Sequence, residues 1–322
     1  LTSVSKDRQA GMSMEKQGIR GSTPRGCRGA AGASTGAPCL ISQRLACVLV
    51  AVLLMATGSS RATPTNSECL ECHSTKGEVA TNAAGKVVSL FVDEQPFKAS
   101  VHGDLSCTDC HQDIKDLPHA ERLAPVQCAG CHDDVGKQYA TSIHGVSKAM
   151  GASGAATCSS CHGSHNIVPV KQGDSPVFKL NLPATCARCH NNPNLTSEYR
   201  MKFPQAAEQY MESIHGRALI KLGLIIAPSC NDCHGVHNIR RSVDRDSPIN
   251  HTRIAGTCGK CHVGVEQTYL KSVHGRLLAK GDPRGPVCTD CHTAHQIDTQ
   301  AGGGHHKAAS DERCGKCHQD RL

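Results

Sequence analysis

The distribution of apolar residues divides the chain into a leader and a longer, mostly polar remainder. Arg44 precedes an apolar run from Leu45 to Ala56, and small residues follow, which is the layout of a secretory signal with cleavage at Ser60-Arg61-Ala62. The run is shorter than the roughly 20 residues that span a bilayer, so we favour cleavage, with an uncleaved anchor as the alternative. We expect residues 1–62 to be a leader and signal peptide, and we find no apolar stretch after Ala62 that could cross a membrane.

The remainder predicts short helices and very little strand. Residues 74–95 alternate apolar and polar positions around NAAGK, which predicts a small β-hairpin near residues 78–92. The stretches DDVGKQYATS and GVEQTYLKS have helical composition, and each runs into the pattern S-x-H-G, whose glycine is expected to end the helix. We also expect short helices at the CxxCH motifs described below. The predicted fold class is therefore mainly α with little regular secondary structure.

The composition leaves the predicted helices without an ordinary core. The chain has 322 residues with 21 Cys and 20 His, but only four Phe, four Tyr and no Trp. Large apolar side chains normally fill a domain of this size, so something else must supply the core. After residues 1–62 the balance is 27 basic against 26 acidic residues, a net charge of +1, which gives nucleic-acid binding no support.

The cysteines after the leader follow a single pattern. Cys27, Cys39 and Cys47 lie in the leader, and the other 18 all form CxxC pairs that are followed directly by His. The pairs are Cys69 and Cys72, Cys107 and Cys110, Cys128 and Cys131, Cys158 and Cys161, Cys186 and Cys189, Cys230 and Cys233, Cys258 and Cys261, Cys288 and Cys291, and Cys314 and Cys317. We number these motifs as sites 1 to 9.

C-x-x-C-H is the attachment signature of c-type haem, in which both thiols bind the porphyrin and the adjoining His binds the iron. Zinc sites gather four ligands from two such pairs and need no His after each one. A redox CxxC occurs once in a βαβ setting, and disulfides prefer neither this spacing nor a trailing His. The sequence therefore predicts nine covalently bound haem c groups. Their proximal iron ligands would be His73, His111, His132, His162, His190, His234, His262, His292 and His318.

On these motifs, residues 63–322 resemble the multihaem c-type cytochromes of bacterial periplasms and outer surfaces that carry doubled CxxCH motifs. The resemblance implies a haem-packed array, in which the macrocycles themselves form the hydrophobic core. That would explain why the chain has so few aromatic side chains.

The second axial position of each iron decides between electron transfer and catalysis. Four histidines share one setting, with an aromatic residue five positions before, Ser two before and Gly just after: His102, His144, His215 and His274. A repeated helix cap with an incidental His is the alternative reading. The recurrence of so scarce a residue favours distal ligation.

Three more candidates follow a proximal His by three residues, and we call CxxCHxxH the doubled-His motif. They are His165, His237 and His295. A residue this close to the proximal His cannot reach the far face of the same haem, so each is expected to bind a neighbouring one and to fix two haems close together.

Two last candidates, His119 and His305, each lie nine residues before the next CxxC pair and complete a set of nine. His251 and His306 are then spare. His306 adjoins His305, and the choice between them stays open. His251 stands where the related repeat has Lys179.

An internal duplication links these motifs. S-I-H-G, CxxCHGxHNI, DSPV or DSPI, and CxxCH follow one another from Ser142 to His190 and again from Ser213 to His262, and a third copy begins at Ser272. We expect residues 63–127 to form an N-terminal segment with sites 1 and 2, and residues 128–322 a duplicated segment with sites 3 to 9.

The predicted function is an electron relay through closely packed, low-spin haems that each have two His ligands, and not an enzyme. Two alternatives stay open: a nitrite, hydroxylamine or tetrathionate reductase with one open haem, and a subunit of an extracellular haem filament. A relay in the periplasm or at the cell surface needs other redox proteins as partners. We expect a membrane-bound quinol-oxidising cytochrome or a dehydrogenase as donor, and a cytochrome or terminal reductase as acceptor.

Overall fold

The protein was analysed as a computed structural model, which describes residues 63–82, 85, 87–297 and 314–319. The chain separates into a unit from Leu1 to Ser60 and a unit from Arg61 to Leu322, and the second contains every described residue. The predicted leader and signal peptide lie outside the described residues. The division of the second unit at residues 127 and 128 stays a prediction.

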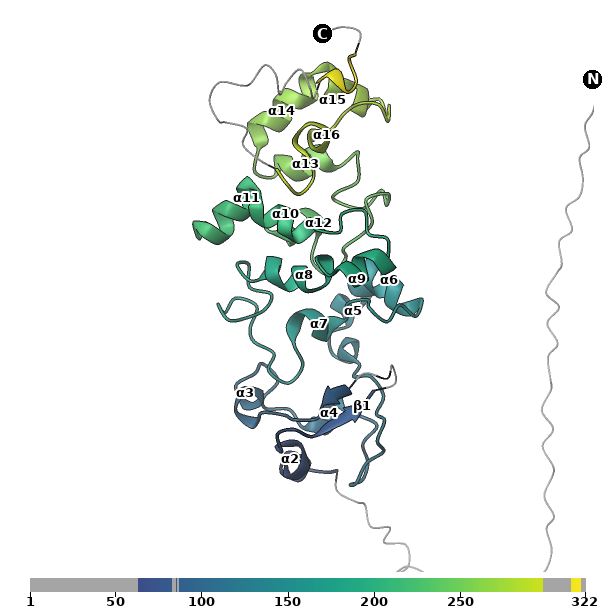
Figure 1. The fold of residues 1–322 in the computed structure, drawn as a ribbon, viewed down its shortest axis with the longest axis vertical. Coiled ribbons are helices and arrows are strands. Elements are labelled where there is room, and N and C mark those ends of the chain that lie inside the picture. The colour runs from purple at the N-terminus through teal and green to yellow at the C-terminus, as the bar shows by residue number, and fades with distance from the viewer. Residues whose placement is uncertain (1–62, 83–84, 86, 298–313, 320–322) are drawn as a thin grey trace, which may run out of the picture. The chain divides into compact units, whose positions relative to one another are not determined.

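Short helices joined by irregular segments make up the described part of the chain (Figure 1). In chain order the elements are α2 Asn66–His73, β1 Val79–Thr81, β2 Val87–Ser89, α3 Glu94–Lys98, α4 Cys107–Cys110, the 3₁₀ turn η1 Cys128–Gly130, α5 Asp133–Ala140, α6 Ile143–Ala149, α7 Cys158–His162, α8 Leu182–His190, α9 Pro193–Glu198, α10 Ala206–Glu212, α11 Ile214–Gly216, the π-helix η2 Arg217–Lys221, α12 Cys230–His234, α13 Ile254–Gly259, α14 Val263–Lys271, α15 Val273–Ala279 and α16 Cys288–His292. This confirms the predicted fold class.

The predicted hairpin is present. Strands β1 and β2 pair antiparallel with Ala80 opposite Val88, and within the described residues they form a sheet of two strands. The Nδ1–H group of His73 lies 2.9 Å from the carbonyl oxygen of Leu90, just after β2, to which it can donate. The hairpin therefore borders site 1.

Helix formation at the CxxCH motifs has a local cause. The residue before the second Cys is Asp or Ser at several sites, and its side chain caps the first turn by accepting a backbone N–H. Asp232 accepts from Ser229 N at 2.7 Å, and Asp290 accepts from Val287 N at 2.7 Å. The N-cap residues Ser229 and Val287 lie just before the first Cys of each motif, so α12 and α16 begin at that Cys.

The S-x-H-G phrases differ from our prediction in one respect. Helices α5, α10 and α14 do precede three of the phrases, but there the phrase begins a new helix and its glycine does not end the old one. Ser142, Ser213 and Ser272 are the N-caps of α6, α11 and α15, and each hydroxyl accepts a hydrogen bond from the glycine N–H three residues later. The serine stops one helix and caps the next, so the histidine lies in the first turn of the second helix.

Few apolar side chains are buried among the described residues, as the composition indicated. The buried apolar residues there are Ile114, Ala207, Leu219, Ala227, Ala255 and Val287. Leu219 is the largest fully buried side chain of this set. A core of this size cannot hold a chain of this length together by itself, which fits a protein whose core is completed by bound groups. In the part of the chain that the structure describes, no helix is both long and apolar enough to span a membrane.

Candidate functional site

The described histidines face one another in pairs. Each pair joins one predicted proximal ligand to one predicted distal ligand, with ring centroids 5.9–6.2 Å apart. The pairs are His73 and His119, His132 and His102, His111 and His165, His190 and His144, His162 and His237, His262 and His215, His234 and His295, and His318 and His274. Every described proximal histidine except His292 has such a partner.

The spacing fits a metal ion between the two rings. Two imidazole nitrogens that bind one ion axially, at about 2 Å each, bring the ring centroids to about 6 Å. The interplanar angles range from 2° to 63°, although the centroid separation hardly changes. Ring stacking would fix the angle along with the distance, whereas an axial ligand is free to rotate about its bond. The pairs therefore suit iron with two axial histidines.

In three of the S-x-H-G phrases the flanking residues hold the predicted distal histidine in one orientation. In the first copy Ser142 Oγ donates to Tyr139 O at 2.7 Å and accepts from Gly145 N at 3.0 Å. A Cβ atom on Gly145 would lie 2.0 Å from Tyr139 O, so no larger residue fits there. Tyr139 is fixed in turn, because its hydroxyl donates to Ala156 O at 2.9 Å. Two later copies repeat the tyrosine bond, from Tyr210 to Pro228 O at 2.6 Å and from Tyr269 to Pro286 O at 2.9 Å.

The doubled-His motifs reach other sites, as the backbone geometry requires. His165 follows site 4 and faces His111 of site 2, while His237 follows site 6 and faces His162 of site 4. His295 follows site 8 and faces His234 of site 6. Each motif therefore connects its own site to the site two positions earlier, so that one site is skipped.

A set of backbone hydrogen bonds joins the segments that carry the two kinds of predicted distal ligand, and the sequence alone did not predict these bonds. The residue before an S-x-H-G histidine donates its N–H to the isoleucine that ends a doubled-His motif. Val101 bonds Ile167 O at 2.9 Å, Ile143 bonds Ile239 O at 2.7 Å, and Ile214 bonds Ile297 O at 2.8 Å. The recurrent Ile after each doubled His was visible as part of the repeat, but its partner lies too far along the chain for local patterns to show.

Site 1 is built from the most irregular part of the described chain. His119 belongs to no helix or strand, and it faces His73 with the two rings nearly parallel. The Nδ1 atoms of His73 and His119 lie 2.9 and 2.8 Å from the carbonyl oxygens of Leu90 and Ala120, to which each can donate a proton. Such bonds fix the tautomer of a ligating histidine and leave its Nε2 lone pair for the metal. The sequence alone did not show that His119 belongs with site 1.

Burial favours the neutral form of several paired imidazoles, which is the form that binds metals. Desolvation lowers the pKa of His144 and of His190, which form one pair. Burial, followed by the neighbouring imidazole of His295, lowers the pKa of His234 to about 4. Burial, followed by the adjacent Cys69, raises the pKa of the Cys107 thiol to about 11, whereas the hydrogen bond with Cys258 lowers the pKa of the Cys288 thiol to about 7.

Successive cysteine pairs lie next to one another from site 1 to site 8. The first thiols of sites 1 and 2, 3 and 4, 5 and 6, and 7 and 8 interact directly. The second thiol of sites 2, 4 and 6 lies close to the cysteines of the site that follows. The spatial order of the attachment motifs is therefore their order in the sequence.

Comparison with known proteins agrees with this geometry. Residues 99–199 match the family described as Cytochrome c3, and this stretch contains three of the histidine pairs in whole and two in part. A multiheme cytochrome, MtrC of Shewanella baltica, is 32% identical over 69 residues. The chain is a multihaem c-type cytochrome.

The likeness to MtrC is local, since it covers 20% of this cytochrome and the chain spans only 11% of that relative's length. No solved structure matches the chain. The comparisons support covalent haem c and electron transfer as the chemistry of the cytochrome, while the number of haems is inferred from the CxxCH motifs.

Site 8 is the one site of the cytochrome whose second histidine is not among the described residues. His292 ends α16, and the predicted partner His305 lies outside the described residues, as does His306. The other spare histidine, His251, has its Nε2 atom 3.9 Å from the carboxylate of Asp290 and is partly exposed. That position agrees with leaving His251 out of the predicted ligand set.

Proposed function

We propose that the protein is a nine-haem electron relay in which two histidines close every iron. Each haem c, when bound, supplies an iron that gains and loses one electron. The polypeptide's part is to attach the groups through paired cysteines, to fill both axial positions and to hold neighbouring sites in contact. With both positions filled, no substrate reaches the metal, so electrons pass without bond chemistry.

The observation that carries this proposal is the set of eight histidine pairs with a common centroid separation near 6 Å. For site 8 we propose His305 as the second ligand of the iron that His292 binds. The succession of cysteine contacts supports it, because these contacts would give an electron a path through sites 1 to 8 in chain order.

We further propose that the relay works in the periplasm or at the cell surface, because c-type haem is attached outside the cytoplasm and the sequence predicts a secretory signal. Its partners would be other redox proteins. A membrane-bound quinol-oxidising cytochrome or a dehydrogenase would supply electrons, and a second cytochrome or a terminal reductase would accept them.

Intact-mass spectrometry of the exported protein tests the count. We expect nine covalent haems and a mature start near Thr63. Fully reduced protein should then deliver nine electrons per chain to a soluble ferric chelate. It should not consume nitrite, hydroxylamine or tetrathionate catalytically. Fewer haems, fewer electrons, or turnover of any of these three compounds would contradict the proposal.

A further inference from the structure

The histidine pairs differ in what surrounds the ring nitrogens that do not bind the iron. At site 1 both rings have a backbone acceptor, since His73 Nδ1 lies 2.9 Å from Leu90 O and His119 Nδ1 lies 2.8 Å from Ala120 O. Among the pairs in the described part of the chain, this is the one in which both rings have such an acceptor. Site 1 therefore differs from the other sites in the surroundings of its ligands, although its centroid separation of 5.9 Å is like theirs.

Sites 2 and 6 have the opposite arrangement. The Nδ1 atoms of His111, at site 2, and of His295, at site 6, are buried and have no hydrogen-bond partner among the described residues. Because protein atoms cover both nitrogens, bulk water does not reach them. At site 6 the neighbour is apolar, since the ring of Phe203 packs against that of His295 with 5.0 Å between the centroids.

This difference changes how strongly the imidazoles donate to the iron. A hydrogen bond from Nδ1–H to a carbonyl oxygen makes a ligating imidazole more basic. A more basic ligand stabilises the oxidised iron, which carries more positive charge, and so lowers the reduction potential. A buried Nδ1–H without an acceptor does not supply this stabilisation. The reduction potential of site 1 should therefore lie below those of sites 2 and 6.

The charges beside the cysteines separate site 1 from site 6 in the same direction. Helix α2 carries Glu68 and Glu71 next to the site 1 cysteines, and it contains no Lys or Arg. At site 6 the residue equivalent to Glu71 is Asp232, and its carboxylate is paired with Lys179 at 3.1 Å. A carboxylate without a cation beside it favours the more positive, oxidised form of a nearby iron. Charge and hydrogen bonding thus act together at site 1.

We propose that site 1 has the lowest reduction potential in the relay, and that the carbonyl groups of Leu90 and Ala120 are what lowers it. The proposal rests on the relay proposed above, because it ranks the sites of that relay. Sites 1 and 2 adjoin through Cys69 and Cys107. One electron that leaves the iron of site 1 therefore reduces a neighbour of higher potential, and site 1 is reoxidised in the same step. A strongly reducing redox protein would deliver its electrons at site 1.

A potentiometric titration of the haem-loaded protein tests the ranking, with haem absorbance as the readout. The component that is reduced last should account for about one ninth of the absorbance change, because the chain has nine CxxCH motifs. The double variant C69S and C72S removes the haem of site 1 and should lose this component. The matched control, C107S and C110S, removes the haem of the adjoining site 2. It should keep the last component and lose one that is reduced earlier.

The variant L90P tests the cause of the low potential. It removes the N–H that Leu90 donates to Glu78 O at 3.0 Å, which holds the Leu90 carbonyl in place beside His73. His73 itself is unchanged, so nine low-spin haems should remain while the last component moves to a higher potential. The other eight components serve as the internal control. If L90P loads haem poorly, V92P replaces it, since Val92 N donates to His73 O at 2.7 Å and holds the same segment.

The ranking is overturned if the C69S and C72S variant keeps the last component, or if the C107S and C110S variant loses it. The assigned cause is overturned if L90P leaves the potential of that component unchanged or lowers it. Neither result affects the relay itself, because haem number and spin state are measured separately.

Discussion

The two complete copies of the repeat, Ser142–His190 and Ser213–His262, build the same sites with different supporting contacts. The histidine pairs have almost equal separations, 6.2 Å for His144 and His190 and 6.1 Å for His215 and His262. In both copies a buried serine is followed by a proline, and the carbonyl oxygen of this proline accepts a hydrogen bond from a threonine. Thr185 donates to Pro176 O at 2.7 Å, and Thr257 donates to Pro248 O at 2.6 Å.

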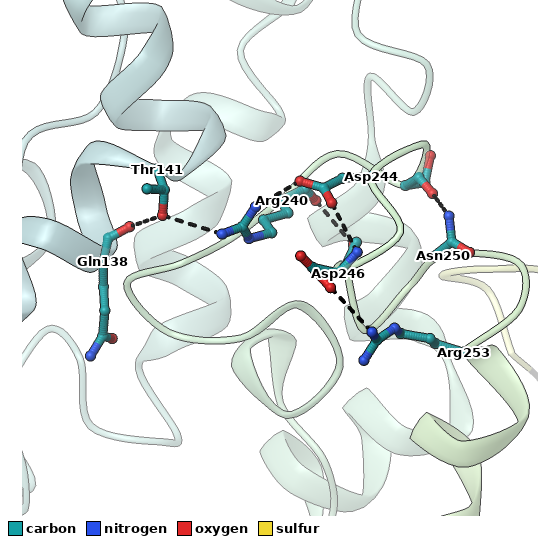
Figure 2. A network of polar contacts seen from close by, with 9 residues as sticks. Gln138, Thr141, Arg240, Asp244, Asp246, Asn250 and Arg253 are labelled. Atoms are coloured by element: carbon teal, nitrogen blue, oxygen red, sulfur yellow. Dashed lines mark hydrogen bonds and ion pairs between the residues drawn. The ribbon is translucent and has the colours of Figure 1, made fainter.

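Around this shared frame the polar contacts differ. In the first copy Asn181 closes the loop by donating to Gly173 O and Ser175 O at 2.8 and 2.9 Å. In the second copy Asn250 donates to Ser242 O at 2.9 Å, and charged residues are added, which Figure 2 shows as a network that reaches α5. Arg240 bonds Asp244 at 2.9 Å and Thr141 at 3.5 Å, and Arg253 bonds Asp246 at 3.2 Å.

The comparison shows which residues set the site geometry. The Ser, Gly and Tyr around each distal histidine are the same in both copies, while the loop contacts were replaced without changing the histidine spacing. The motif residues therefore fix the ligand positions, and the loop between them stabilises the fold in more than one way.

The two copies should differ most in which iron loses its second ligand when the doubled histidine of each copy is replaced. H165A should open the iron at site 2, and H237A should open the iron at site 4, because each loses the second ligand that faces it. Electron paramagnetic resonance should show about one high-spin haem in nine for either variant. Adding C158S and C161S, which removes the haem of site 4, should abolish the high-spin signal of H237A and leave that of H165A. The opposite pattern would refute the pairing.

The glycine after each distal histidine should matter equally in both copies. G145A and G216A each place a Cβ atom 2.0 Å from a tyrosine carbonyl oxygen, so the histidine before it must shift. We expect a loss of about 1–3 kcal/mol in unfolding free energy, measured by urea titration, together with partial high-spin character. G264A is the control, since no atom lies within 4 Å of the Cβ position there. A mild effect at Gly145 or Gly216 would show that the phrase is less rigid than the geometry indicates.

The two copies should differ less in the unfolding free energy that one pair of equivalent side-chain contacts contributes. Lys179 bonds Asp232 at 3.1 Å, and at the same position of the second copy His251 lies 3.9 Å from Asp290. The longer contact of His251 makes the weaker pair, because electrostatic attraction falls with distance. K179A should therefore cost under about 1 kcal/mol in unfolding free energy, and H251A should cost less. Urea unfolding of both variants would measure the two losses, and a larger loss for H251A than for K179A would contradict the expectation.

The smallest effect, on the pH dependence of the melting temperature, should come from removing the ion pair between Arg240 and Asp244 in the second copy. The hydrogen bond from Arg240 lowers the pKa of Asp244. The ionised carboxylate therefore contributes stability above the pKa that it has in the unfolded chain, and this contribution is lost as the pH falls through the lower, folded value. D244N should flatten the acid side of the melting-temperature profile slightly and leave the haem spectrum unchanged. Q172A, at the equivalent position of the first copy, should leave the profile as it is.

The sequence predicted much of this organisation because the motifs are local. Cysteine spacing, the trailing histidine and the hairpin around NAAGK depend on neighbouring residues, and the fold class and the hairpin are confirmed. The S-x-H-G turn was assigned to the wrong end of a helix, because a serine can stop one helix and cap the next in the same place.

What the sequence could not supply is long-range pairing. His119 lies 46 residues from the His73 that it faces, and Ile143 bonds Ile239 across 96 residues. Counting ligands against irons gave a set of candidates but not their assignment to sites. Only the folded chain brings these partners together.

The most direct test of the relay is the spin state of the oxidised protein, measured by electron paramagnetic resonance beside a quantitative haem assay. The account predicts nine haems per chain, all low-spin, because two histidines close each iron. A high-spin share of about one haem in nine or more would contradict it. Such a result would mean that an iron stands open to substrate.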